Sequence, residues 1–199
     1  MTATVHAGNL GRWFEELCRL KHVRLADLVD RQTWRLVRDV LPDSGGVYAF
    51  WWSGPLSLLK AGARRRFLEL AGPAAMSVRI KVDDEWLGLA TGLPVPLYVG
   101  KTAESLQRRV GQHLRLRDRR TIHTAGGRRK QRAPTTSCQL RAGVDHLFPH
   151  RRDTRQLVLE NIGVSFVLLD GPTHAANRFY LEDLAVGLMR PPLNVDVER

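Results

Sequence analysis

The chain has 199 residues, which is long enough for a proper hydrophobic core, and we expect a single domain over residues 1–199. Its net charge of +11 accompanies 43% hydrophobic residues, a composition typical of a globular protein rather than a disordered one. No apolar run approaches a membrane span and no CxxC pair occurs, so we expect a cytoplasmic protein with neither a membrane segment nor a disulfide framework.

Two helices are expected at the start of the chain. Apolar residues recur at helical spacing from Leu10 to Leu17. A second helical pattern runs from Leu25 to Val40 and stops at Pro42. We therefore assign residues 1–42 to N-terminal helices.

Three short strands are expected among the helices. "GVYAFWW" (46–52), "LYVGK" (97–101) and "VSFVLLD" (164–170) are rich in β-branched and aromatic residues, with glycine or proline nearby. The segment between the first two strands, residues 49–97, has neither repeats nor low complexity, and we expect an ordered insertion. The fold class is therefore α/β (α+β), with residues 98–199 completing the core.

The helix expected after the second strand has one buried stripe. Leu106, Val110 and Leu114 fall on one face of a helical projection, while Arg109 and His113 lie at the edge of that face. For an isolated pair, an arginine that covers the core edge and a satisfied core histidine would be the simpler interpretation. The pair is not isolated in this sequence, because the last long helix supplies a second unusual group.

That helix, expected over residues 175–190, places one carboxylate in an apolar setting. Glu182 has Phe179, Val186 and Met189 as its neighbours along the helix, whereas Asp183 lies on the polar face. A carboxylate in such a setting is costly unless it is paired or binds a cation. Both a salt bridge to an arginine and a metal-ligand role remain open for Glu182.

Most of the excess positive charge lies in one stretch. Residues 101–132 contain eleven lysines and arginines and only two acidic residues. A solvated face could explain a charge run, but this concentration favours a polyanionic partner, with nucleic acid as the leading candidate. The basic residues expected to contact DNA are Arg64, Arg65, Arg66, Arg108, Arg115, Arg128, Arg129 and Lys130.

Two common catalytic motifs are missing from the sequence. It contains neither a Walker A loop nor a GxSxG nucleophile elbow. One carboxylate, one arginine and a pair of tyrosines instead match the inventory for metal-assisted phosphodiester hydrolysis.

Five elements in chain order resemble the GIY-YIG nuclease superfamily. They are "GVY" at 46–48, "YVG" at 98–100, Arg109, Glu182 and Asn194. The large insertion, the step of four from Arg109 to His113 and the step of twelve from Glu182 to Asn194 are most similar to its type II restriction endonucleases.

The resemblance implies a small three-stranded antiparallel sheet flanked by helices, and a role for each site residue. Tyr48 and Tyr98 would lie near the attacking water, with one phenol as general base. Arg109 would stabilise the pentavalent phosphate, and Glu182 would hold Mg²⁺ (or Mn²⁺).

Three further residues receive supporting roles from the same resemblance. His113 would orient a tyrosine or the phosphate, and Asn194 would anchor local backbone or contact DNA. Lys101 would bind phosphate or assist the base.

The function expected is sequence-specific cleavage of double-stranded DNA, with two chains acting as a homodimer on a palindromic site. Arginines in the insertion, including Arg64, Arg65 and Arg66, would read the DNA sequence, although three adjacent arginines could equally form a solvated helix face. The alternatives are a structure-specific or non-specific nuclease of a mobile element or defence system, and a DNA-binding module that does not cut.

Overall fold

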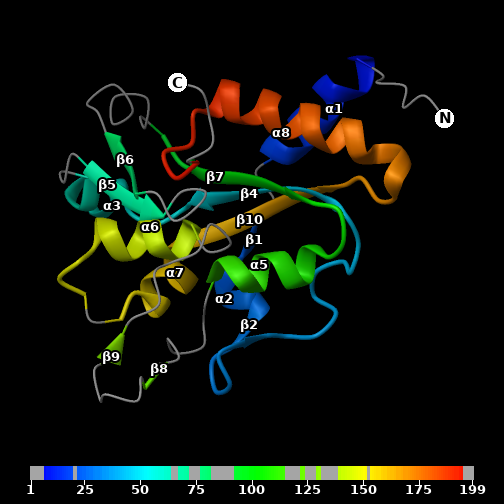
Figure 1. Ribbon diagram of the computed structural model, residues 1–199. Helices are drawn as coiled ribbons and strands as arrows, with labels where there is room; N and C mark the ends of the chain where they lie inside the picture. The colour runs from blue at the N-terminus through cyan, green and yellow to red at the C-terminus, as the bar shows by residue number, and fades with distance from the viewer. Residues whose placement is uncertain are drawn as a thin grey trace.

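The protein has a mixed α/β architecture in which helices cover both faces of a central sheet (Figure 1). The computed structural model describes residues 7–19, 22–63, 67–71, 77–81, 92–114, 122–123, 129–130, 139–151 and 153–194. Within these ranges, no helix combines the length and apolar character needed to cross a membrane.

The central sheet has four antiparallel strands in the order β1-β10-β4-β7. Their bounds are Val23–Arg24 (β1), Gly46–Trp52 (β4), Val95–Thr102 (β7) and Ile162–Leu168 (β10). The three strands expected from the sequence are present, with ends that differ by up to two residues. The expected three-stranded sheet gains a fourth strand, because the two-residue β1 pairs with β10 at one edge.

Each face of the sheet has its own helices and its own hydrophobic cluster. On one face lie α1 (Ala7–Cys18) and α8 (Ala175–Met189), which pack on the sheet through residues such as Trp13, Leu17 and Leu181. On the other lie α5 (Leu106–Leu114), α6 (Gln139–Leu147) and α7 (Arg155–Asn161). Strand alternation explains the division: Val47, Ala49 and Trp51 face α8, whereas Tyr48, Phe50 and Trp52 face α5 and α6.

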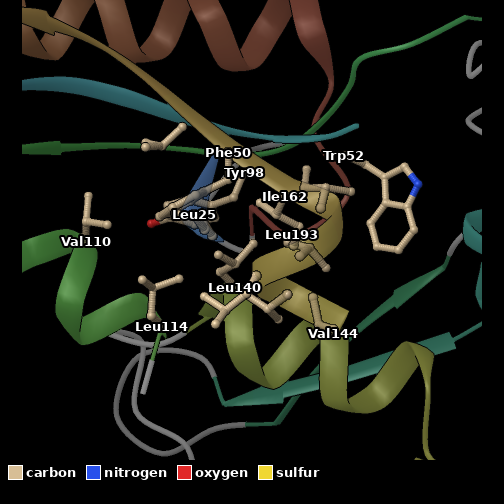
Figure 2. Close-up of a cluster of buried hydrophobic side chains, with 14 of the residues drawn as sticks. Leu25, Phe50, Trp52, Tyr98, Val110, Leu114, Leu140, Val144, Ile162 and Leu193 are labelled. Atoms are coloured by element: carbon tan, nitrogen blue, oxygen red, sulfur yellow. The ribbon is translucent and has the colours of Figure 1, made fainter. Parts of the chain in front are cut away.

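The larger cluster joins the sheet to α5 and α6. Figure 2 shows Phe50 and Tyr98 on the sheet above Val110, Leu114 and Leu140 of the two helices. Leu106, Val110 and Leu114 are all buried, as expected from the helical projection. This packing fixes the position of α5 against β4 and β7.

The second N-terminal helix predicted from the sequence is wrong. Residues 25–40 instead form the four-residue α2 (Leu25–Leu28) and the short paired strands β2 (Val29–Asp30) and β3 (Arg35–Leu36). The Asp30 carboxylate accepts hydrogen bonds from the backbone N–H of Gln32 and the hydroxyl of Thr33, and Trp34 adopts a positive φ of 52°. These local bonds stabilise a turn in competition with the helix.

The insertion between β4 and β7 contributes one helix and one hairpin to the described part of the chain. It contains α3 (Leu56–Ala63) and an antiparallel hairpin of β5 (Phe67–Ala71) and β6 (Ser77–Lys81). The remaining elements are short: β8 (Ile122–His123), β9 (Arg129–Lys130) and the 3-10 helix η3 (Pro172–His174).

Candidate active site

The register between β4 and β7 places two tyrosines on the same face of the sheet. Phe50 lies opposite Tyr98, and Tyr48 lies opposite Gly100. The register shifts next to Phe50, so that Trp51 pairs with Pro96 and Leu97 is the extra residue of a bulge. Tyr48 and Tyr98 are therefore diagonal neighbours, with ring centroids 6.3 Å apart.

Gly100 leaves the space that the two phenols occupy. A Cβ atom at this position would lie 2.5 Å from the Tyr48 hydroxyl oxygen and 2.8 Å from a ring carbon of Tyr98. Tyr48 therefore leans across the backbone of the neighbouring strand, and its hydroxyl reaches Arg109 and His113 of α5. No other residue type fits at Gly100 without moving a ring.

The start of α5 is fixed by three hydrogen bonds, and this start sets the direction of Arg109. The Ser105 hydroxyl caps the helix by accepting the N–H of Arg108 at 3.0 Å. The N–H groups of Leu106 and Gln107 donate to backbone carbonyls of Ser44 and Pro42. With the helix held in this register, Arg109 is half-buried at the sheet.

Arg108 points the other way, as predicted. Its guanidinium is exposed and pairs with Glu104 one turn earlier, at 2.6 Å. The two adjacent arginines of α5 therefore differ in environment: Arg109 lies beside the tyrosines and Arg108 is exposed to solvent. Arg108 can serve as a control for Arg109.

Tyr48, His113 and Arg109 form one hydrogen-bond network. Arg109 Nε donates to the Tyr48 hydroxyl at 3.2 Å, and that hydroxyl lies 2.7 Å from His113 Nε2. The Tyr48 oxygen accepts the bond from Arg109, and the direction of its bond to His113 is set by the tautomer of the imidazole. The Nδ1 atom is buried and has no partner among the described residues.

Burial sets the protonation states of this network. It raises the pKa of Tyr48 well above its usual value, and the neighbouring Tyr98 raises it further, against the opposite effect of Arg109. It also lowers the pKa of His113 to about 3, with a smaller contribution from Arg109. At neutral pH the phenol and the imidazole are therefore both uncharged.

Arg109 carries the positive charge at this side of the sheet. Burial alone would lower its pKa, but Tyr48 and Tyr98 beside it raise the value above the usual one. No ion pair found within the described residues includes Arg109, whose Nη1 atom also donates to the Gln112 side chain at 3.3 Å. A half-buried guanidinium held by neutral groups is suited to binding an anion.

Glu182 and Lys101 form the second part of the site, on the opposite face of the sheet. Lys101 alternates with Gly100 along β7 and pairs with Glu182 of α8. Burial raises the pKa of Glu182, and the ammonium and backbone N–H of Lys101 oppose that rise. The sequence left open a salt bridge to an arginine; the ion pair exists, but its cation is a lysine.

The two parts of the site interact around the β7 edge. The carboxylate of Glu182 is one of the groups that raise the pKa of Tyr48, so the charge of Glu182 reaches the tyrosine network. β7 is the outermost strand of the sheet among the described residues, so the two parts lie on either side of a sheet edge.

A divalent cation at this site would have one protein carboxylate as its ligand. Within the described ranges, no three histidine, cysteine, aspartate or glutamate side chains cluster in a way that could hold a metal. A single carboxylate suits Mg²⁺, because this cation keeps most of its waters and binds substrate phosphate. The Glu182 side chain is 21% exposed, so a cation can reach it, and burial raises the energy of its ionised form. A bound cation would compete with the Lys101 ammonium.

Asn194 holds the outer edge of β7. Its side-chain amide donates to the Val99 carbonyl at 2.8 Å and accepts from the Val99 N–H at 2.9 Å. The adjacent Leu193 N–H donates to the carbonyl of Leu97, the bulge residue. Asn194 therefore fixes the strand that carries Tyr98 from the side opposite β4.

Most of the residues expected to contact DNA lie outside the described part of the chain. These are Arg64, Arg65, Arg66, Arg115 and Arg128. Arg129 and Lys130 form the short strand β9. Arg108 is exposed on α5, beside the site.

Sequence reasoning misses two residues that shape the site. Gly100 stands out only as part of "YVG", although strand alternation puts it on the same face as Tyr98 and next to Tyr48. Ser105 is the second, and a serine just before an apolar helical pattern is a usual helix start that could have revealed it.

Comparisons with known proteins do not assign the chain to a family. No protein-family model matches it, and no curated protein or solved structure shows significant similarity. Its own residues and their geometry are what bear on its function.

Gly100→Ala should destabilise the protein, because the added methyl group displaces Tyr48 and Tyr98. We expect a loss of about 1–3 kcal/mol in the free energy of unfolding, measured by urea denaturation. Gly187→Ala is the matched control: it lies in α8 with open space around it, and should be neutral or stabilising. Unchanged stability of Gly100→Ala would contradict the close packing of the two rings.

His113 should make the protein acid-sensitive. The folded state keeps His113 neutral down to about pH 3, whereas the unfolded chain takes up a proton below about pH 6.5, so acid favours unfolding. His113→Gln lacks this titration, so only the parent loses this part of its stability in acid. The free energy of unfolding of the parent minus that of the variant should fall by about 2 kcal/mol from pH 7 to pH 5. Urea denaturation at both pH values measures the gap, and a constant gap would mean that His113 titrates normally.

Proposed function

We propose that this protein is a metal-dependent DNA endonuclease with a GIY-YIG-like catalytic core. The observation that carries the proposal is the position of Arg109, half-buried against the Tyr48 phenol and without a carboxylate partner among the described residues. Glu182, whose charge reaches the same phenol, supplies the acidic group that the reaction needs.

Phosphate is the anion that this arrangement suits best. Phosphodiester hydrolysis builds negative charge on the equatorial oxygens of the phosphorus, and a guanidinium fixed in place beforehand stabilises that charge. Arg109 is fixed by Tyr48 and by the capped start of α5. A carboxylate partner would have to be displaced before phosphate could bind, and none is seen in the described chain.

Both phenols lie beside Arg109, and the proposal gives each of them a role. Tyr48 has a raised pKa and hydrogen bonds to both Arg109 and His113, so it orients the arginine and is a poor base. By elimination, the proposal assigns Tyr98, the second phenol beside Arg109, as the group that accepts the proton of the attacking water. His113, neutral and buried, holds Tyr48 in place.

Glu182 is the proposed ligand of Mg²⁺ (or Mn²⁺). When bound, the cation would neutralise phosphate charge and assist deprotonation of the water. Lys101 pairs with the carboxylate and favours its ionised form, and in the proposal it pairs with a phosphate oxygen once Glu182 binds the cation.

Double-stranded DNA is the proposed substrate because of the basic stretch at residues 101–132. We favour sequence-specific cleavage by a homodimer on a palindromic site, with the insertion between β4 and β7 as the reader of the sequence. A non-specific nuclease and a DNA-binding module without activity are the alternatives.

One plasmid assay separates these functions. The purified protein is incubated with supercoiled plasmid and Mg²⁺, with EDTA in a parallel reaction. Discrete fragments that require Mg²⁺ support a sequence-specific nuclease, and a smear supports a non-specific one. Intact plasmid that still binds the protein would overturn the enzyme proposal.

Glu182→Gln should abolish cleavage and preserve DNA binding, because it removes the charge and keeps the shape of the side chain. Asp183→Asn is the matched control, since Asp183 is exposed on the next position of α8. Plasmid cleavage and gel-shift affinity are measured for both. Cleavage by Glu182→Gln at saturating Mg²⁺ would rule out Glu182 as the metal ligand.

Arg109→Ala should lower the cleavage rate by about two to three orders of magnitude, because transition-state charge loses its fixed partner. Arg108→Ala changes the adjacent exposed arginine and should mainly weaken binding and its salt dependence. Single-turnover cleavage and salt-dependent binding distinguish the two effects. If both variants lose only affinity, Arg109 is an ordinary phosphate contact.

A further inference from the structure

α8 exposes two adjacent aromatic side chains beside the candidate site. Phe179 is 53% exposed and Tyr180 is 47% exposed, and their rings meet edge to face with centroids 5.5 Å apart. The following residue, Leu181, is fully buried and anchors this turn of the helix in the core. The two rings form an exposed aromatic surface on an anchored turn of the helix, which we call the α8 aromatic pair.

The α8 aromatic pair adjoins the Lys101–Glu182 ion pair. The Lys101 ammonium lies over the Phe179 ring, 5.2 Å from its centroid, and also contacts Glu182 one helical turn away. An exposed aromatic ring, a cation and the proposed metal ligand therefore lie within one turn of α8 and the end of β7. Lys101 itself keeps 38% of its side chain exposed.

Nucleic acid fits this combination better than another protein surface does. A strand offers an aromatic base for the ring and a phosphate for the ammonium, and proteins that bind unpaired strands combine these two contacts.

We propose that the α8 aromatic pair stacks on an unpaired or flipped-out nucleobase next to the scissile phosphate, an inference that rests on the proposed nuclease function. Phe179 supplies the main stacking surface and Tyr180 supports it from the side. Contact with the base holds the strand in position beside Lys101, at the end of β7.

Binding of two oligonucleotides tests the stacking directly. One is a single strand of mixed sequence, and the other has the same backbone with abasic residues in place of the bases. Fluorescence anisotropy with Ca²⁺ instead of Mg²⁺ gives the preference for the base-containing strand. Phe179→Ala should reduce this preference about tenfold, while affinity for the abasic strand stays the same.

Further variants separate stacking from general hydrophobicity and from loss of fold. Phe179→Leu keeps an apolar side chain and should lose the preference, whereas Phe179→Trp should retain it. Leu188→Ala removes another exposed apolar side chain of α8, 62% exposed, and should leave the preference unchanged.

The outcomes separate this inference from the proposed function. If the protein cleaves plasmid with Mg²⁺, two binding results would overturn the stacking role alone. In the first, the parent protein binds the base-containing and abasic strands equally. In the second, Phe179→Ala keeps the full preference for the base-containing strand. A Phe179-dependent preference without cleavage would support the stacking role and overturn the nuclease. Conversion of a dimer to a monomer by Phe179→Ala, with the preference intact, would assign the pair to a subunit contact instead.

Discussion

The candidate site depends on the close approach of the Tyr48 hydroxyl to the backbone of Gly100. This approach lets the phenol of a β4 residue lie over the β7 backbone, where its hydroxyl reaches Arg109 and His113 of α5. It also brings the phenol within electrostatic reach of Glu182 on the other face of the sheet. A side chain at Gly100 would separate the network from both the arginine and the carboxylate.

Much of this arrangement follows from local patterns in the sequence. Strand alternation in "GVYAFWW" places Tyr48 and Phe50 on one face, and the helical spacing of Leu106, Val110 and Leu114 sets the buried side of α5. Those two periodicities are enough to direct Arg109 toward the sheet and Arg108 toward solvent, as the structure has them. Local patterns predict such features because each depends on neighbours in the chain.

Other features depend on partners that a local pattern does not contain. The apolar spacing between Leu25 and Val40 suits a helix, but the Asp30 side chain stabilises a turn within it. The bulge at Leu97 aligns Tyr98 with Phe50, and only the pairing of two strands reveals it. The apolar neighbours of Glu182 along its helix predict either a metal ion or an arginine as its partner. In the structure the partner is Lys101, 81 positions away in the sequence.

The hydrogen bonds between Asn194 and Val99 can form only late in the synthesis of this part of the chain. The two residues are 95 positions apart, so β4, β7 and α5 leave the ribosome well before the segment that closes the outer edge of β7. Until then the strand that carries Tyr98 has an open edge with unpaired backbone groups. A nascent chain in which Asn194 has not yet been added therefore holds the tyrosines without the hydrogen bonds that fix the outer edge of β7.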